Sequence, residues 1–261
     1  MKKVIMRLVV ALVVLIILAV LALGLFLDSA IKRGVETFGP KLTKVDITLQ
    51  SVNLSILSGS GSIKGLVVGN PEGFSEPSAI RVGSASLSLK PSSLLSDKIV
   101  IKSIKVEAPE ITYETTLRTS NLDKILANVK EATGGGETEP AKPEEPAQPQ
   151  EAKPTKKLEV DEFIITGGKV RGSVTGVGGV TVPLPDIRLT DLGTGPEGIT
   201  AAELAERVLA AIKTGAAKAV SGSAGDLGKM ATSAVKDAGG TGSNAVQSIT
   251  KGIGGLFKKD K

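Results

Sequence analysis

The 261-residue chain contains no cysteine, no histidine and no tryptophan. Without cysteine it can form no disulfide bond, thiol nucleophile or thiolate metal site. Without histidine it lacks the usual general base near neutral pH and the commonest transition-metal ligand. An enzyme built from this chain would have to use carboxylates, lysines or hydroxyl groups, and no motif singles out such a set. We therefore expect a protein that is not an enzyme, with no catalytic residue, no metal site and no cofactor.

Aromatic residues are also scarce, since the chain has one tyrosine and five phenylalanines. The formal net charge of +5 is typical of some nucleic-acid-binding proteins. However, the basic residues are scattered or lie at the two ends, and there are too few aromatic rings to stack on bases. We expect no nucleic-acid partner and assign the basic charge to solubility or to contact with a membrane surface.

One long apolar run stands near the start of the chain, at residues 8–27. Twenty helical residues span about 30 Å, which is the thickness of the hydrocarbon core of a bilayer. A cleavable signal peptide has a shorter apolar core and small neutral residues at its cleavage site. Here Asp28 places a charge at that point. The run therefore predicts an uncleaved transmembrane signal anchor.

The charges on the two sides of this run suggest its orientation. Lys2, Lys3 and Arg7 precede it, and Lys32 and Arg33 follow it. The excess of positive charge before the run favours a cytoplasmic N-terminus. No later segment is apolar enough to span a bilayer. We expect a single-pass protein with the bulk of the chain outside the cytoplasm.

After the apolar run, residues 28–42 resemble a short helix that ends at Gly39–Pro40. From Val45 the apolar period changes to two, which is typical of a β-strand with one buried face. The phase of this alternation slips once, between Leu49 and Val52, and again at Gly83 in the segment "AIRVGSASLSLK". Each slip predicts either a β-bulge or a short break between strands.

Two short segments predict turns between these strands. Asn70-Pro71-Glu72-Gly73 suits a type I turn, with proline setting φ and glycine at the fourth position. The segment "GSGSIKG" at residues 59–65 resembles a phosphate-binding loop but lacks the required spacing and ending. We interpret it as a hairpin turn.

Two amphipathic helices are predicted beyond the first strands. The segment "SNLDKILANVKEA" carries one apolar stripe, and Ser120 or Asn121 can cap it. Thr200 and Glu203 form a capping box before the second helix. Between the two, "LEVDEFIITGGKV" echoes the earlier strand, break and second strand of residues 104–112, which indicates a weak internal repeat.

The composition divides the chain into six parts. These are a cytoplasmic basic region (1–7), the anchor (8–27), a first β-rich part with a closing helix (28–132), a disordered Pro/Glu/Lys-rich linker (133–156), a second β part with a helix (157–214) and a Gly/Ala/Lys-rich tail (215–261). The tail is either disordered or amphipathic and bound at a membrane surface.

The alternating segments predict eight to ten strands with one apolar and one polar face, as in an antiparallel sheet with one solvated side. The fold class is mainly β with a few helices (α+β). Two short helices are a modest cover for such a sheet. Either the sheet curls on itself, or its apolar face is an open groove, or the chain forms an ordinary closed core.

If a groove exists, it is a natural site for lipid acyl chains, because burial of methylene groups needs no hydrogen bond. The residues predicted to line it belong to one alternating set. They are Val45, Ile47, Leu49, Val52, Leu54, Ile56, Ile63, Leu87, Leu89, Ile99, Ile101, Ile104 and Val106.

Several segments, taken in order, resemble the AsmA-like family of bacterial envelope proteins. After the anchor come "GLVVGNPEGF", "AIRVGSASLSLKPSSLLSDKIVIKSIKVEAPEITYE" and "NLDKILANVK", and beyond the linker "LEVDEFIITGGKV" and "LPDIRLTDLG". The resemblance covers residues 1–212 without the linker, and the order of the segments carries it rather than one motif.

The resemblance implies an inner-membrane protein whose periplasmic part is a curved, taco-like β-sheet. It also implies that the apolar hollow serves phospholipid movement or outer-membrane assembly. About nine strands at 4.8 Å spacing are too few to bridge two membranes, so this chain resembles a short member. The partners expected are the membrane, phospholipid and envelope proteins. The alternatives are a non-catalytic envelope scaffold with a closed core and a protein partner, and an enzyme with a polar pocket.

Overall fold

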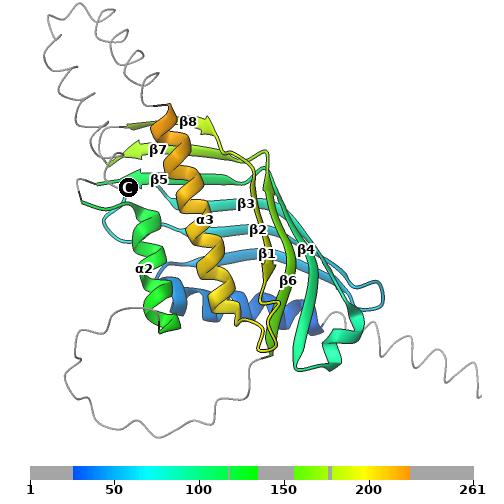
Figure 1. Cartoon of the computed structure of the whole chain (residues 1–261). Coiled ribbons are helices and arrows are strands. Elements are labelled where there is room, and N and C mark those ends of the chain that lie inside the picture. Colours follow the sequence, from blue (N-terminus) through cyan, green and yellow to red (C-terminus); the bar gives the residue numbers. More distant parts are fainter. Residues whose placement is uncertain (1–25, 117, 135–155, 176–177, 224–261) are drawn as a thin grey trace, which may run out of the picture.

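The computed structural model describes residues 26–116, 118–134, 156–175 and 178–223. These residues form one nine-stranded sheet with helices on one face (Figure 1). Regions 1–7 and most of 8–27, of the linker and of the tail therefore lie outside the described residues. No helix in the described ranges is both long enough and apolar enough to cross a bilayer.

The first strands form an antiparallel meander. A helix at residues 26–43 precedes β1 (Ile47–Ser55), which pairs with β2 (Ser60–Gly69), and β2 pairs with β3 (Ser78–Leu89). The 3₁₀ turn η1 (Pro91–Leu95) then leads into β4 (Lys98–Glu107). The sequence predicted these strands and the β1–β2 hairpin turn, although β2 already begins at Ser60, inside the segment 59–65.

The rest of the sheet contains two parallel strand pairs, so the prediction of a wholly antiparallel sheet is wrong. After β4 come β5 (Glu110–Thr115), α2 (Asn121–Thr133), β6 (Lys157–Thr166), β7 (Lys169–Val174), β8 (Gly178–Pro183), β9 (Ile187–Leu192) and α3 (Ala201–Gly222). The pairs β4–β6 and β5–β7 are parallel. The chain segment from 116 to 156, which contains α2, provides the long crossover that a parallel pair requires.

The predicted internal repeat is confirmed as strand, break and strand, and its two copies lie side by side. Lys98 pairs with Lys157 on β4–β6, and Thr115 pairs with Val174 on β5–β7, so each pair is separated by 59 residues. The break between the strands in the two copies is made by Ala108 at φ 45° and by Gly167 at φ 64°.

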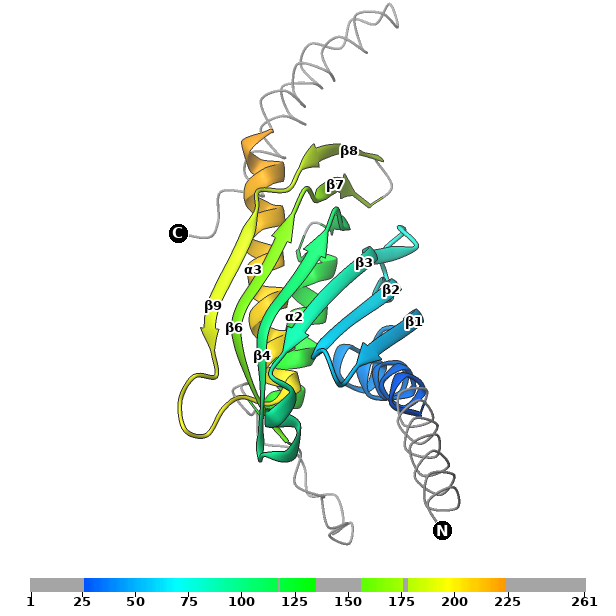
Figure 2. The same cartoon turned by 90° about the vertical axis from the view of Figure 1, so that its right-hand side faces the viewer.

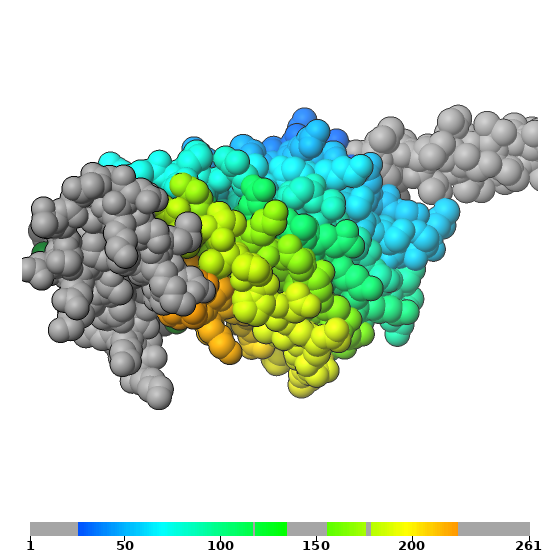
Figure 3. Space-filling model, turned by 90° about the horizontal axis from the view of Figure 1, so that it is seen from above, coloured from blue at the N-terminus to red at the C-terminus, as the bar shows by residue number. Residues whose placement is uncertain are grey.

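The sheet curves around the side on which α2 and α3 lie (Figure 2). We call this side the inner face and the opposite side the outer face. The main contacts of the two helices are with β5, β7, β8 and β9. In the view from above, the blue and cyan residues of β1–β3 lie opposite the yellow and orange residues of β9 and α3, with green residues between them (Figure 3). The described sheet is thus open rather than closed into a barrel.

Both predicted helix starts are confirmed. Ser120 caps α2, and its partner in the capping box is Asp123. Thr200 caps α3 with Glu203 as its partner. The structure extends α3 to Gly222, past the predicted end at 214, because α3 remains packed on the sheet beyond that point: Ala216 and Val220 are buried.

The helix at residues 26–43 also continues past its predicted end at Gly39–Pro40. Proline removes only one backbone donor, and the hydroxyl of Thr43 donates to the Gly39 carbonyl at 2.9 Å. Lys44, at φ 58°, closes the helix by donating its N–H to the Pro40 carbonyl. A left-handed residue at this position is a common helix end.

The turn after β2 is centred one residue later than predicted. The N–H of Phe74 donates to the carbonyl of Pro71, and Gly73 has φ 92°. Positive φ at the third position is typical of a type II turn rather than type I. The side chain of Asn70 is therefore free to bind the Glu76 carbonyl at 2.9 Å.

The predicted slips in strand phase are real, and neighbouring strands share them. Inward-facing residues are three apart instead of two on each of the first strands: Leu49 and Val52, Ile63 and Leu66, Val82 and Ala85. The register does not shift, since Leu49 pairs with Leu66 and Ser51 with Lys64. Neither predicted alternative describes this slip, because each strand is continuous and both partners share the step. Gly65, at φ 62°, lies at its centre.

A second shared step crosses β4, β6 and β9. It separates Ile101 from Ile104, Val160 from Phe163, and Leu189 from Leu192. Here the register between β3 and β4 does shift at Ser88/Leu89, as in a β-bulge. Asp191, at φ 57°, occupies the step on β9. The same device therefore keeps apolar side chains on the inner face in both halves of the sheet.

The edge strand β1 is covered by the helix at residues 26–43. Glu36 Oε1 accepts the N–H of Leu49 at 3.0 Å, and Asp28 Oδ1 accepts the N–H of Leu54 at 2.8 Å. Lys32 Nζ donates to the carbonyl of Gln50 at 3.1 Å. Free edges invite pairing with other strands, so these side chains protect the sheet at this side.

Candidate functional site

The inner face is crossed by rows of directly paired apolar residues. One row runs across six strands: Leu54, Gly61, Leu87, Ile104, Phe163 and Leu189. The next row runs parallel to it: Val52, Ile63, Ala85, Val106, Ile165 and Ile187. No member of either row carries a polar side chain, so these rows can bind a ligand only by burying apolar surface.

The side chains in these rows are more buried on β6 and β9 than on β2, β3 and β4. On β6 and β9, Phe163, Ile165 and Ile187 are buried in the same core cluster as Ile212 of α3, and Leu189 is partly buried. On β2, β3 and β4 the same rows are only half-buried at Ile63, Leu87, Ile104 and Val106. The difference follows from the helix positions, because the main contacts of α2 and α3 are with β5, β7, β8 and β9.

We call this half-buried set the apolar strip. Its members all lie on β1–β4: Leu54, Ile63, Leu87, Leu89, Ile99, Ile101, Ile104 and Val106. The strip is continuous at its centre because two leucines lean over one glycine. A Cβ atom on Gly61 would lie 2.5 Å from Cδ2 of Leu54 and 3.1 Å from Cγ of Leu87. The glycine therefore lets the two side chains lie against the sheet.

The thirteen predicted lining residues divide into two groups. Val45, Leu49 and Val52 are buried, with 2–6 % of their surface exposed, and belong to the core. The other ten are half-buried: the eight members of the strip together with Ile47 and Ile56. Ile47 packs against the core, and its side chain would lie 2.8 Å from a Cβ atom on Gly39.

The prediction missed the apolar residues that border the strip from the second half of the chain. They are Leu158 on β6, Leu189 on β9, and Leu204, Val208 and Leu209 on α3, all partly buried against the core. The internal repeat was the signal that could have found the first of these, since Leu158 pairs with Ile99. No sequence pattern indicated where α3 would lie.

The outer face is polar, as the alternation predicted. Opposite the strip, Asn53, Ser62, Ser86 and Lys105 form one paired row across β1–β4. Ser51, Lys64, Ser84 and Glu107 form another. The sheet is therefore apolar on one side and hydrophilic on the other, so only the inner face can take up an apolar ligand.

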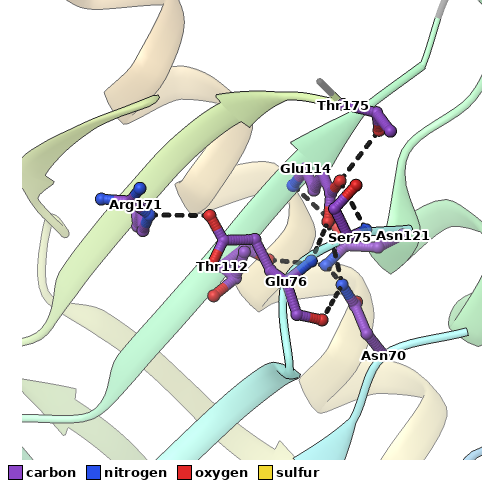
Figure 4. A network of polar contacts seen from close by, with 8 residues as sticks. All are labelled: Asn70, Ser75, Glu76, Thr112, Glu114, Asn121, Arg171 and Thr175. Atoms are coloured by element: carbon purple, nitrogen blue, oxygen red, sulfur yellow. Dashed lines mark hydrogen bonds and ion pairs between the residues drawn. The ribbon is translucent and has the colours of Figure 1, made fainter. Parts of the chain in front are cut away.

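The outer face also has a depression of about 230 Å³ over β3, β5 and β7, lined in part by Arg81, Glu110 and Lys169. Its charged groups include the pair formed by Arg171 Nε and Glu76 Oε1, which are 2.8 Å apart (Figure 4). None of the carboxyl groups with a shifted pKa lines it. Mutual pairing is the ordinary role of such surface charges.

Beside this depression, Glu114 holds the loop between β2 and β3 in place (Figure 4). Its side chain is 1 % exposed, yet both carboxylate oxygens accept hydrogen bonds. Oε1 accepts from Ser75 N at 2.8 Å and from Thr175 Oγ1 at 2.9 Å, and Oε2 accepts from Glu76 N and Asn70 Nδ2, both at 3.0 Å. All its donors belong to the protein, so Glu114 has a structural role.

The environment of Glu114 acts on its pKa in two directions. Burial raises the pKa, but the four hydrogen bonds, led by those from the backbone of Glu76 and Ser75, lower it more. The net result is a pKa below the ordinary value, so the group is ionised at neutral pH. Asn121 completes the arrangement by accepting the N–H of Glu114 at 3.0 Å.

Within residues 26–116, 118–134, 156–175 and 178–223, no three side chains of aspartate or glutamate are grouped so as to hold a metal ion. In the same ranges, the apolar strip is the feature that offers a chemistry beyond structural support. That chemistry is the burial of aliphatic groups, which contributes about 0.8 kcal/mol for each methylene.

Comparison with known proteins gives one match. The family model described as the AsmA family matches residues 1–173. No curated protein and no solved structure matches the chain significantly.

Proposed function

Because the chain belongs to the AsmA family, a family of bacterial envelope proteins, we propose that it binds phospholipid acyl chains on the apolar strip. In this proposal residues 8–27 anchor the protein in the inner membrane and the sheet lies in the periplasm. The protein acts without catalysis, either by holding lipid for short-range delivery or by supporting outer-membrane assembly.

The observation that supports the proposal is the uncovered half of the inner face. Leu54, Leu87 and Ile104 belong to one row, with Gly61 between the two leucines, and each remains only partly buried. Three strand spacings of about 4.8 Å give this part of the row a width of about 14 Å. A contiguous apolar surface that is only partly covered supports a binding role.

A second candidate function has its own supporting observation. On β6 and β9 three of the four members of the same rows are buried, and Phe163 and Ile165 are only 7 % and 2 % exposed. A sheet that is closed over half its width suits an envelope scaffold that acts through a protein partner. In that case the apolar strip would be covered by the partner rather than by lipid.

A lipid-extraction experiment separates the two functions. The fragment 28–261 is purified without detergent, so that no detergent can occupy the strip, and its organic extract is examined by mass spectrometry. The test variant is Leu54→Asp with Ile104→Asp. The matched control is Asn53→Asp with Ser86→Asp, which adds the same two negative charges on the outer face.

We expect stoichiometric phospholipid with the unchanged fragment and the control variant, and its loss from the test variant with circular dichroism unchanged. A folded fragment that carries no phospholipid would contradict lipid binding and leave the scaffold function. Equal loss from both variants would contradict the inner face as the binding surface.

The proposed topology is tested separately. The chain has no cysteine, so Glu72→Cys introduces a single thiol on the exposed loop after β2. In intact spheroplasts we expect a membrane-impermeant maleimide to label this thiol. Labelling only after lysis would contradict a periplasmic sheet.

A further inference from the structure

The exposed large hydrophobic side chains of the described residues all belong to the first part of the chain. They are Phe26, Ile31, Phe38, Leu57 and Leu95, and the two leucines are the most exposed, at 81 % and 94 %. Single exposed apolar residues are common on protein surfaces. A set confined to residues 26–95, with no member on β4–β9, α2 or α3, needs an explanation.

Three members of this set lie at one end of the sheet. Phe26 is the first described residue of the helix whose Asp28 accepts the N–H of Leu54, near the end of β1. Leu57 lies in the turn that follows β1. Gly59 in that turn accepts the N–H of Leu89 at 2.7 Å, which places it beside the segment leading to Leu95.

We call this end the loop end and define it by residues 26–28, 56–59, 91–97, 156–157 and 193–198. Further contacts join these segments. Lys156 Nζ binds the carbonyl of Leu94, Lys157 N donates to the carbonyl of Asp97 at 3.1 Å, and Lys98 Nζ donates to the carbonyl of Gly195 at 3.2 Å. In Figure 1 the β1–β2 turn, η1 and the start of the first helix lie together on the right-hand side.

The chain outside the described residues also points to this end. The apolar run of residues 8–27 includes Phe26 and ends directly before Asp28. If that run crosses a bilayer, the membrane surface lies within a few residues of the loop end. Leu57 and Leu95 are then the apolar side chains nearest to the lipid outside the anchor itself.

We propose that the loop end rests in the lipid bilayer, with Leu57 and Leu95 inserted among the acyl chains beside the anchor. The occupant of this surface is thus the bilayer and not a protein. The inference deepens the proposed function, on whose anchor it depends. With the loop end in the bilayer, the apolar strip opens at the membrane. Leu54 and Leu89 lie in β1 and β3 just before the segments that contain Leu57 and Leu95.

The charges of the loop end sharpen the proposal. Lys156 is exposed there, but so are Asp97 and Glu197. Attraction to anionic headgroups requires an excess of one charge sign. We therefore expect insertion to depend on the two leucines and to change little with salt or with the headgroup charge.

The lack of tryptophan makes the test direct. Full-length chains with Leu57→Trp, Leu95→Trp or Glu72→Trp are reconstituted into phosphatidylcholine vesicles, with and without bromine on the acyl chains. Glu72 is exposed on the loop beyond the far end of β2, whose ten residues span about 30 Å. Flotation of the vesicles first shows whether each chain is membrane-bound.

We expect brominated lipid to remove about half or more of the emission at positions 57 and 95 and almost none at 72, as for side chains inside and outside the acyl region. Because tryptophan itself favours membrane interfaces, a reporter at Ser96→Trp is also compared with and without Leu57→Asp and Leu95→Asp. Its quenching should fall when the leucines become aspartates.

The outcomes separate the two proposals. Flotation with no quenching at 57 and 95 overturns the inserted loop end and leaves the anchor. No flotation overturns both. Quenching of Ser96→Trp that is unchanged by the aspartates overturns the role of the leucines. Phospholipid binding by the fragment 28–261 is measured without vesicles, so its failure does not affect these results.

Discussion

The carboxylate of Glu114 accepts a hydrogen bond from the backbone N–H of Ser75 at 2.8 Å, across 39 residues of the chain. This contact joins the loop after β2 to strand β5, although the two lie far apart in the sequence. The same loop makes a second contact, since Asn70 Nδ2 donates to the other oxygen of Glu114.

Replacing this carboxylate should weaken the fold. Glu114→Gln keeps the shape but turns one acceptor into a donor that faces other donors. We expect a loss of about 1–3 kcal/mol in the free energy of unfolding, as for a buried polar group left unsatisfied. Urea unfolding followed by circular dichroism measures it. Glu110→Gln, exposed on the same strand, is the control, and equal losses in both variants would contradict the prediction.

The fold should also lose stability in acid. The folded-state pKa of Glu114 lies below its ordinary value of 4.5, and that of Asp123 below 3.8. For Asp123 burial raises the pKa, but Lys213 Nζ, 2.7 Å away, and Ser120 lower it more. The unfolded chain therefore binds these protons at higher pH than the folded chain does.

The contributions of Glu114 and Asp123 to folding stability are therefore fully present above the ordinary pKa values. They are lost as the pH falls through the lower pKa values of the folded state. Thermal midpoints measured from pH 6 downward should fall below about pH 4.5. The fall should be smaller in Glu114→Gln, which has no carboxyl group at this position. An identical pH dependence in both proteins would contradict the assignment to Glu114.

The packing of α3 on β7 depends on the absence of a side chain at Gly172. A Cβ atom there would lie 2.7 and 2.8 Å from the two Cγ atoms of Val220. Gly172→Ala should therefore cost about 1–3 kcal/mol of stability through overpacking. Gly195→Ala, which has open space around its Cβ position, should be close to neutral.

Removing the clashing carbons should restore part of this loss. We expect the double variant Gly172→Ala with Val220→Ala to be more stable than the sum of the single changes predicts, by about 1 kcal/mol. The measurement is a double-mutant cycle of urea unfolding. Strict additivity would show that α3 does not pack on β7 through these two residues.

The protection of the β1 edge can be tested one hydrogen bond at a time. Glu36→Ala should speed amide exchange at Leu49 about tenfold or more and leave Leu54 unchanged, because a bond to a charged acceptor is lost. Asp28→Ala should do the reverse. Each variant is the control for the other, and a uniform acceleration at both amides would contradict separate caps.

The apolar strip should be far less sensitive to truncation than the covered core. Ile111 is 1 % exposed under the helices, so Ile111→Ala should cost about 2–5 kcal/mol. Leu87 is half-buried, and Leu87→Ala should cost about 1 kcal/mol because its side chain already contacts solvent. Equal losses would show that the strip is closed in solution.

The sequence predicts those helices and strands whose formation depends on residues close together in the chain. The caps at Ser120 and Thr200 depend on residues three positions apart, and the strand alternation depends on neighbours. The phase slips were also visible, but their nature was not. Whether a slip is a bulge or a break depends on what the paired strand does, and that is a property of two segments.

Strand direction and helix placement were not accessible in this way. β6 lies parallel to β4 because the segment containing α2 carries the chain back, which no alternation records. Eleven of the thirteen predicted lining residues lie on β1–β4, but the alternation does not separate the buried Val52 from the half-buried Leu54 on β1. The role of Glu114 was missed because its donors come from Ser75, Glu76, Asn70 and Thr175, which the sequence does not place together.

The constant separation of 59 residues between paired positions of β4–β5 and β6–β7 has a consequence for symmetry. Two units in parallel register repeat along the sheet at one strand spacing, about 4.8 Å, with the twist that is usual between neighbouring strands. A further strand-break-strand copy in the same register therefore leaves the existing β4–β6 and β5–β7 pairs unchanged. Each added copy lengthens the apolar rows of the inner face by one strand.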